Sequence, residues 1–313
     1  MSRVLVVPTI RESNIVEFLE QWTKQETWDQ IIVVEDNPER SFNLPNNNLT
    51  HVSWKEIDED LKENSWIISR RDSAIRSYGF LMAYRMGADY IFTLDDDCFP
   101  SQKDFCETHI NQTTQHQKWT ELVPFMRTRG IPYHNLGQIP VVMNVGIWSG
   151  VPDLDSIQGL ANPISDFNPP KGNRILPRNQ YFPMCGMNML FVSELAVLMY
   201  FAPMGLNQPY HRFDDIWCGI ILKRICDHLD LSISCGEPHV NHRRASNPFV
   251  NLIREAPGIQ ANENFWPIID QIPLTKETPK ECLLEISAGL QQQSGQYLNQ
   301  YGKALETWSG LFQ

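Results

Sequence analysis

Strand-like and helix-like segments alternate over the first hundred residues of the chain. The segments with the apolar composition of buried strands are residues 4–10, 31–34, 51–54 and 90–94. Residues 14–24 and 72–86 carry apolar side chains at the three- and four-residue spacing of amphipathic helices. This alternation predicts an α/β fold in which a largely parallel central sheet carries helices on both faces.

Three consecutive carboxylates, Asp95, Asp96 and Asp97, follow the apolar run 90–94. Adjacent acids repel one another unless a cation neutralises them, and hard divalent cations take oxygen ligands. Ligands of parallel α/β sheets bind beyond the carboxyl ends of the strands. A solvated acidic turn is the alternative, but the buried-looking strand before the triplet favours a metal site. An Asp-x-Asp after a strand is also similar to the motif of GT-A-type nucleotide-sugar glycosyltransferases.

Polar residues follow two other predicted strands. Pro8, Thr9 and Arg11 come at the end of the first strand, and Asp36 comes at the end of the second. Because the carboxyl ends of parallel strands share one edge of the sheet, we expect these residues to converge with the aspartate triplet.

A third polar group begins the helix at 72–86. Asp72 is predicted to cap this helix, and Arg71 and Arg76 are predicted to face a pyrophosphate. The alternative is an ordinary surface helix start.

Two clusters in the second half of the chain carry further possible chemistry. Asp214 and Asp215 precede a predicted helix at 215–229, where one acid suffices as the N-cap and the other is available for substrate hydroxyls or base catalysis. His242 could complete a metal site begun by carboxylates, and Arg244 could screen a leaving diphosphate. Surface residues without a ligand are the alternative for both.

Composition excludes some classes of protein. The chain has 26 Lys and Arg against 37 Asp and Glu, a net charge of −11, which argues against nucleic-acid binding because phosphate neutralisation needs clustered basic residues. The short apolar run at 4–7 predicts neither a signal peptide nor a membrane span. Seven cysteines without CxxC spacing are typical of reduced thiols, so we expect a cytoplasmic protein whose only route to membranes is through partners.

The remaining segments suggest that the chain consists of two parts. Residues 151–183 are rich in Pro, Asn, Gly and Asp and predict a long irregular excursion, and 189–201 is predicted to be helical. After residue 254 apolar side chains recur at helical spacing, with a break near Ser294 and Gly295. We therefore predict a catalytic domain over 1–254 and a C-terminal helical appendage over 255–313.

Several motifs, in order along the chain, carry a resemblance to one family. They are Val7–Arg11, Asp72–Ala74 with Arg76, Leu94–Phe99, Arg129–Gly130, Phe182–Asn188, Arg212–Trp217, Ile225–Leu229 and Ala245–Leu252. With these runs the chain resembles the reversibly glycosylated polypeptides, the UDP-arabinopyranose mutase family of plant cell-wall metabolism. The resemblance implies a GT-A-like fold, a UDP-sugar ligand, bound Mn²⁺ or Mg²⁺, interconversion of pyranose and furanose UDP-arabinose, and glycosylation of an arginine.

The resemblance and the residue patterns described above together predict the roles of individual residues. The expected metal ligands are Asp95, Asp97 and His242. The residues expected to contact the UDP-sugar are Pro8, Thr9, Arg11, Asp36, Arg71, Asp72, Arg76, Asp95, Asp96, Asn188 and Arg244. The residues expected to act in catalysis are Arg129, Asp214 and Asp215.

One position departs from the family. A second arginine is expected seven residues after Arg129, but this chain has Leu136 there. The departure leaves two alternatives to the mutase open. One is a glycosyltransferase that passes sugar to a separate acceptor, and the other is a non-catalytic UDP-sugar-binding subunit of a mutase complex. The sequence leaves a homo-oligomer and a hetero-oligomer equally open.

Overall fold

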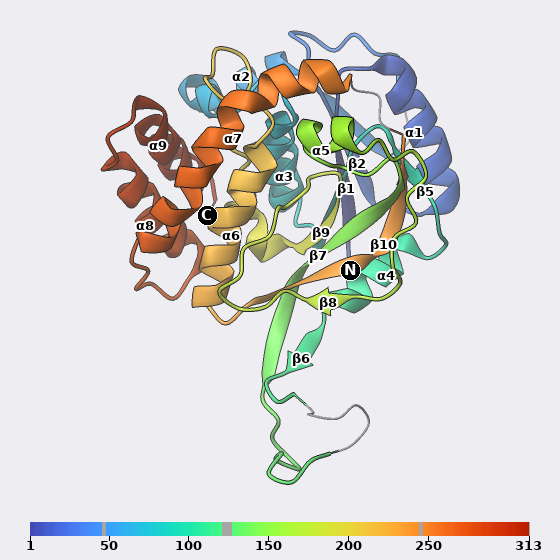
Figure 1. The fold of residues 1–313 in the computed structure, drawn as a ribbon. Helices are drawn as coiled ribbons and strands as arrows, with labels where there is room; N and C mark the ends of the chain where they lie inside the picture. The colour runs from blue at the N-terminus through green and yellow to red at the C-terminus, as the bar shows by residue number, and fades with distance from the viewer. Residues whose placement is uncertain (46–47, 121–126, 244–246, 313) are drawn as a thin grey trace.

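The computed structural model describes residues 1–45, 48–120, 127–243 and 247–312 (Figure 1). Its strands are β1 (Arg3–Thr9), β2 (Gln30–Glu35), β3 (Leu49–Val52), β4 (Tyr90–Leu94), β5 (Cys98–Pro100), β6 (Gln115–Gln117), β7 (Gln138–Gly150), β8 (Arg174–Ile175), β9 (Asn188–Val192) and β10 (Ser232–His242). The main sheet has the order β3-β2-β1-β4-β9-β7-β10-β5. Strands β3, β2, β1 and β4 are parallel, and β7 is parallel to β10. Antiparallel β9 joins the two groups.

The helices cover both faces of this sheet. They are α1 (Glu12–Gln25), α2 (Trp54–Leu61), α3 (Arg76–Arg85), α4 (Phe105–Gln112), α5 (Ser156–Ala161), α6 (Asp214–His228), α7 (Pro248–Gln271), α8 (Pro279–Gln291) and α9 (Gln296–Gly310), with 3₁₀ turns η1 (Lys62–Ile67), η2 (Ser73–Ile75) and η3 (Ser193–Leu198). Helices α1 and α4 pack on one face, and α3, α6, α8 and α9 pack on the other. The predicted α/β class is confirmed.

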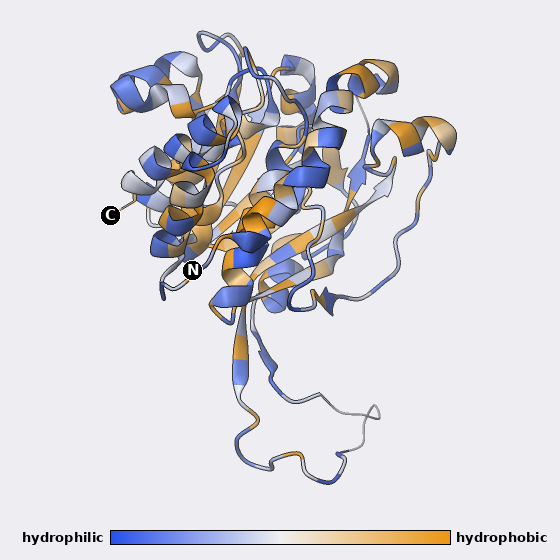
Figure 2. Cartoon of the chain, turned by 60° about the vertical axis from the view of Figure 1, so that its left-hand side comes forward, coloured by the Kyte–Doolittle hydropathy of each residue, from blue (hydrophilic) through white to orange (hydrophobic). Residues whose placement is uncertain are grey.

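The strands form because their apolar runs are buried on both faces. In β1, Val4 and Val6 belong to the cluster with α3, whereas Leu5 and Val7 belong to the cluster with α1. Successive side chains of a strand point to opposite faces, so a run without polar interruptions suits a sheet covered on both sides. Figure 2 shows these strands as the most hydrophobic part of the molecule, enclosed by helices with polar outer faces.

The prediction of a helix at 189–201 is wrong. This segment begins as β9, which pairs antiparallel with both β4 and β7, and continues as η3. Met189, Leu190 and Phe191 are all buried. A short continuous apolar run fits a fully buried strand as well as a helix, and here two neighbouring strands supply the hydrogen bonds that decide between them.

The C-terminal helices share the core of the sheet. The predicted break near Ser294 and Gly295 is confirmed, because α8 ends at Gln291 and α9 begins at Gln296. The boundary expected after residue 254 falls inside α7, whose residue Phe265 stacks on Trp217 of α6 with ring centroids 3.8 Å apart. Trp308 of α9 lies in the same cluster as these two side chains.

One segment lies apart from the body of the molecule. Strands β6 and β7 pair antiparallel, and the described residues 127–137 before β7 project beyond the sheet (Figure 1). Elsewhere the described helices pack on the body, and none of them is both long and apolar enough to span a lipid bilayer.

Candidate active site

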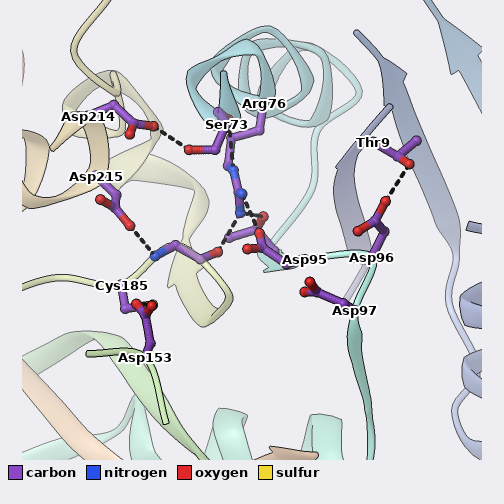
Figure 3. Close-up of polar contacts among 12 residues, drawn as sticks. Thr9, Ser73, Arg76, Asp95, Asp96, Asp97, Asp153, Cys185, Asp214 and Asp215 are labelled. Carbon is purple, nitrogen blue, oxygen red and sulfur yellow. Dashed lines mark hydrogen bonds and ion pairs between the residues drawn. The ribbon is translucent and has the colours of Figure 1, made fainter. Parts of the chain in front are cut away.

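The residues that follow the carboxyl end of β4 line a cavity of about 500 Å³, and Figure 3 shows several of its polar side chains. Its polar lining residues are Ser73, Arg76, Asp95, Asp97, Asp153, Asp155, Gln158, Arg212, Asp214, Asp215, His242, Glu255 and Asn262, and its apolar wall includes Trp148, Met184, Cys185 and Met187. The cavity lies where a parallel α/β sheet is expected to bind its ligand.

The three adjacent aspartates point to different partners. Asp95 is paired with Arg76, and Asp96 is paired with Arg11 and accepts a hydrogen bond of 2.6 Å from the hydroxyl of Thr9. Asp97 lies 3.4 Å from the Arg11 guanidinium and 3.8 Å from Nε2 of His242. Their mutual repulsion is therefore relieved by arginines on two sides, and only Asp95 and Asp97 line the cavity.

The pKa values of Asp95 and Asp96 are shifted in opposite directions. Burial tends to raise the pKa of Asp95, but the Arg76 guanidinium outweighs it and the pKa is lowered. Burial raises the pKa of Asp96 despite its contacts with Arg11 and Thr9. Asp95 is therefore held as a carboxylate beside the cavity.

Arg76 holds Asp95 in place from within the protein. Its side chain is only 1% exposed, donates to the Thr93 hydroxyl at 3.1 Å and to the carbonyls of Ser73 and Gly186, and lies over the ring of Phe201. These bonds, together with the ion pair to Asp95, already occupy most of the donors that Arg76 would need for the predicted contact with a pyrophosphate. In the structure Arg76 positions Asp95.

His242 presents one ring nitrogen to Asp97. Its Nδ1 lies 2.7 Å from the carbonyl of Val151, which can only accept, so Nδ1 donates this hydrogen bond and Nε2 is the nitrogen that faces Asp97. This is the arrangement usual for histidines that bind metals. Within the described ranges, no group of three or more His, Cys, Asp or Glu is arranged to hold a metal by itself. The neighbouring Arg244 lies outside the described residues.

Asp214 and Asp215 form the opposite wall, at the start of α6. Neither is the N-cap as expected, because Phe213 holds that position and both acids lie in the first helical turn. Asp214 accepts a hydrogen bond from the Ser73 hydroxyl, and Asp215 accepts one of 2.8 Å from the Gly186 amide (Figure 3). Burial raises the pKa of Asp214, and burial together with Asp214 raises the pKa of Asp215 well above its ordinary value.

Asp72 does not cap the following helix either. Its carboxylate accepts hydrogen bonds from the Ser69 hydroxyl at 2.8 Å and the Met204 amide at 3.2 Å instead. The Asp72 carboxylate therefore bonds the backbone amide of Met204 and not the first amides of its own helix. Buried backbone amides need a hydrogen-bond partner, and Asp72 supplies one for Met204.

Other residues that were predicted to contact the UDP-sugar do not line this cavity. Asp36 accepts from the Trp54 indole at 2.7 Å, and the exposed Arg71 lies over the same ring at 5.0 Å. Asn188 is buried and donates to the carbonyls of Ile147 and Pro238, so it joins neighbouring strands. Pro8 lies within β1 beside Thr9.

Arg129 lies apart from all of these residues. It is exposed, in the segment between β6 and β7 that projects from the body (Figure 1). It is not among the residues that line the cavity.

Sequence reasoning missed several residues of the site. Asp153 accepts a hydrogen bond of 3.0 Å from the Cys185 thiol, and Arg212 donates to Glu255 at 2.9 Å. Asp153 comes from the irregular stretch 151–183, which has no periodicity to mark it. Cys185 and Arg212 lie within motifs that carried the family resemblance, and these motifs were the sequence signal that could have identified them as site residues.

The fold and cavity define an α/β protein with a ligand site of carboxylates, arginines and one histidine at the strand ends. The family model described as reversibly glycosylated polypeptide matches residues 2–313. Probable UDP-arabinopyranose mutase 1 of Solanum tuberosum is 34% identical, covering 97% of this chain and 88% of the relative. UDP-arabinopyranose mutase 1 of Arabidopsis thaliana is 33% identical, covering 97% and 90%. The chain belongs to the reversibly glycosylated polypeptide family.

The solved structures that match this chain are less similar to it in sequence. A mycobacterial protein is 14% identical with a TM-score of 0.41, covering 78% of this chain and 68% of that protein. Mannosyl-3-phosphoglycerate synthase from Rubrobacter xylanophilus is 10% identical with a TM-score of 0.39, covering 84% and 75%.

Proposed function

We propose that this chain interconverts the pyranose and furanose forms of UDP-arabinose, or of a related UDP-sugar, in the cavity at the end of β4. The observation that carries the proposal is the match, over 97% of the chain, to relatives named UDP-arabinopyranose mutase. The cavity supports it, because one wall suits a diphosphate and the other suits sugar hydroxyls.

The wall formed by Asp95, Asp97 and His242 is proposed to face the diphosphate. Asp97 and the Nε2 of His242 supply oxygen and nitrogen donors on the same side of the cavity, and Arg76 keeps Asp95 ionised beside them. When bound there, Mn²⁺ or Mg²⁺ would screen the charge of the departing diphosphate. Since only two or three protein ligands are at hand, the diphosphate and water are proposed to complete the coordination.

The nucleoside is proposed to lie on the β1 and β2 side of this wall. Thr9 and Arg11 hold Asp96 there, and Asp36 ends the neighbouring strand. Burial raises the pKa of Asp36, while contacts with the Arg71 region and Trp54 oppose that effect. Carboxyl groups in this setting can accept hydrogen bonds from a ribose or a uracil imide.

The wall formed by Asp214 and Asp215 is proposed to handle the sugar ring. Departure of UDP leaves C1 electrophilic, and O4 loses its proton as it bonds C1. The C1–O5 bond then breaks as O5 gains a proton, and UDP re-forms its bond to C1 of the furanose, so no proton is taken up overall and UDP is conserved. Two adjacent carboxyl groups with raised pKa values can retain one proton between them, so one acts as acid and the other as base. The apolar side chains of Trp148 and Met187 help to exclude water from this wall.

A glycosyl adduct on Arg129 is a finer proposal. An arginine is a poor nucleophile while protonated, so the residue needs a nearby base or a highly reactive glycosyl donor. Its place on the projecting segment means that the segment must approach a cavity, in the same chain or in another copy. Intact-mass spectrometry after incubation with a UDP-sugar, followed by peptide mapping, tests the proposal. We expect one added sugar on Arg129 and none in Arg129→Ala, whereas a label elsewhere would contradict it.

Product analysis with UDP-arabinose alone tests the main proposal. We expect the pyranose and furanose forms to equilibrate without an acceptor. Free UDP together with a glycosylated product would instead identify a transferase. Binding without turnover would identify a supporting subunit. Leu136 in place of the family's second arginine suits the transferase alternative.

Cytoplasmic placement is likewise proposed. It is supported by seven cysteines that are all free, five of them buried. Assembly into a homo-oligomer or a hetero-oligomer stays a prediction.

A further inference from the structure

A second cavity, of about 410 Å³, adjoins the first and shares Ser73, Arg212 and Asp214 with it. Two of the shared residues, Ser73 and Asp214, are joined by the hydrogen bond that Figure 3 shows. Neither Asp97 nor His242 lines the second cavity, so it lies outside the proposed metal and diphosphate wall.

Three arginines from separate parts of the chain line this second cavity. Arg71 precedes η2, Arg212 precedes α6, and Arg254 lies in α7. Arg212 donates from its Nε to Glu255. Arg71 donates to the Asn37 side chain at 3.4 Å and its charge acts on the Asp36 carboxyl group, but in the described part of the chain neither Arg71 nor Arg254 forms an ion pair. In a chain of net charge −11, three arginines at one concave surface, two of them outside ion pairs, indicate a site for an anion.

The carboxyl groups in the same wall do not cancel this positive charge in full. Burial and the nearby Asp214 raise the pKa of Asp72 well above its ordinary value, and burial raises the pKa of Asp214. One oxygen of Asp72, Oδ1, is buried and has no hydrogen-bond partner among the residues described. A carboxyl group that keeps its proton can donate to an anion instead of repelling it.

The remaining lining residues suit a small oxyanion. Asn207, Gln208 and His211 also line this cavity, and each has a side chain that can donate hydrogen bonds. Gly205 permits the close approach of this loop, since a Cβ there would collide with the carbonyl of Arg70. Guanidinium groups bind phosphate through two parallel hydrogen bonds, which a carboxylate-lined or apolar cavity cannot provide.

We propose that the second cavity binds the phosphate group of a ligand other than the UDP-sugar, through Arg71, Arg212 and Arg254. A sugar phosphate and free inorganic phosphate share the required chemistry. Because Arg212 and Asp214 face both cavities, a phosphate bound here would contact the wall that holds the sugar.

Titration calorimetry on the full chain tests this proposal. Inorganic phosphate is titrated at constant ionic strength, with and without saturating UDP and Mg²⁺, and arabinose 1-phosphate is titrated in a parallel series. The variants are Arg254→Gln and, as a matched control, Arg174→Gln, which removes the same charge from an exposed position on β8 that does not line either cavity.

We expect saturable phosphate binding in the parent and in Arg174→Gln, unchanged by UDP. Binding to Arg254→Gln should be about tenfold weaker, since a charged hydrogen bond is lost. Tighter binding of the sugar phosphate would identify it as the ligand, and equal binding would identify free phosphate.

Three results would overturn the proposal. They are no saturable binding to the parent, equal affinity in Arg254→Gln, and displacement of phosphate by UDP, which would make this cavity part of the UDP-sugar site. Failure of the mutase proposal is distinguishable, because a chain that binds phosphate through Arg254 but does not bind UDP supports the second site alone.

Discussion

At the scale of single residues, the site is a set of carboxyl groups whose protonation is set by their neighbours. Arg76 lowers the pKa of Asp95 against the effect of burial, whereas burial and Asp214 raise that of Asp215. Two chemically identical side chains on facing walls are thus suited to opposite tasks. In the proposed reaction, Asp95 would stay charged beside the diphosphate and Asp215 would keep a proton beside the sugar.

Asp97→Asn tests the metal proposal. The substitution removes one anionic donor while keeping the size of the side chain, so UDP should bind at least about tenfold more weakly in the presence of Mn²⁺. Without metal the two proteins should bind UDP almost equally, because the lost group acts through the ion. Titration calorimetry measures both affinities, with the exposed Asp166→Asn as a control. Equal affinities with Mn²⁺ would rule out Asp97 as a ligand.

Asp215→Asn tests the raised pKa of its carboxyl group. A carboxyl whose folded-state pKa is raised stabilises the protein fully only below its unfolded pKa of about 3.9, and this stability is lost as pH rises through the folded value. The amide has no such dependence and can still accept the Gly186 hydrogen bond. The melting temperature of the variant should therefore rise relative to the parent as pH increases above about 4. Thermal melts at several pH values measure this difference, and a constant difference would contradict the shift.

At the scale of elements, close packing between α3 and the sheet fixes the position of the site. Gly79 of α3 lies against β1 and β2, where an added Cβ would collide with Val6 and lie 3.1 Å from Val34. Strand β1 ends at Thr9, and Arg76 begins α3, so this contact aligns the two elements that hold Asp95 and Asp96.

Gly79→Ala should destabilise the protein by about 1–3 kcal/mol, the usual cost of overpacking. The matched control is Gly310→Ala at the end of α9, where an added Cβ meets no atom within 4 Å. That change should stabilise the protein by at most about 1 kcal/mol, through helix propensity. Urea denaturation measures both. If the two variants were equally stable, the close approach of α3 to β1 would be wrong.

At the scale of the whole molecule, the C-terminal helices complete the core on one face of the sheet. Trp308 donates to the carbonyl of Val197 at 2.9 Å, and Tyr301 and Phe265 are fully buried around Trp217. Trp217 lies two residues after Asp215 in α6. The packing around Trp217 therefore also holds the first turn of α6, which carries Asp214 and Asp215.

Truncation after residue 271 removes α8 and α9 and tests whether they form a separate unit. Loss of several buried aromatic and aliphatic side chains at about 2–5 kcal/mol each exceeds the stability of an ordinary domain. We expect the truncated chain to aggregate or to lose cooperative unfolding, and the full chain to unfold in one transition by calorimetry. A soluble truncated chain with an unchanged melting temperature would instead support an independent appendage.

The sequence by itself determined the α/β class, the position of the aspartate triplet after β4, and the family. These follow from local patterns, since an uninterrupted apolar run predicts burial and the motifs lie in fixed order along the chain. Segments such as 189–201 could not be decided in this way, because only the neighbouring strands determine whether an apolar run becomes a strand or a helix.

Only the tertiary structure decided which charged residues meet. Asp72 bonds the 204 segment instead of capping its own helix, Asp153 reaches Cys185 across an irregular loop, and Arg212 meets Glu255 of α7. It also placed Arg129 on a segment away from the cavity. Ion pairs and pKa values depend on distances between groups remote in sequence, and those distances exist only once the elements are packed.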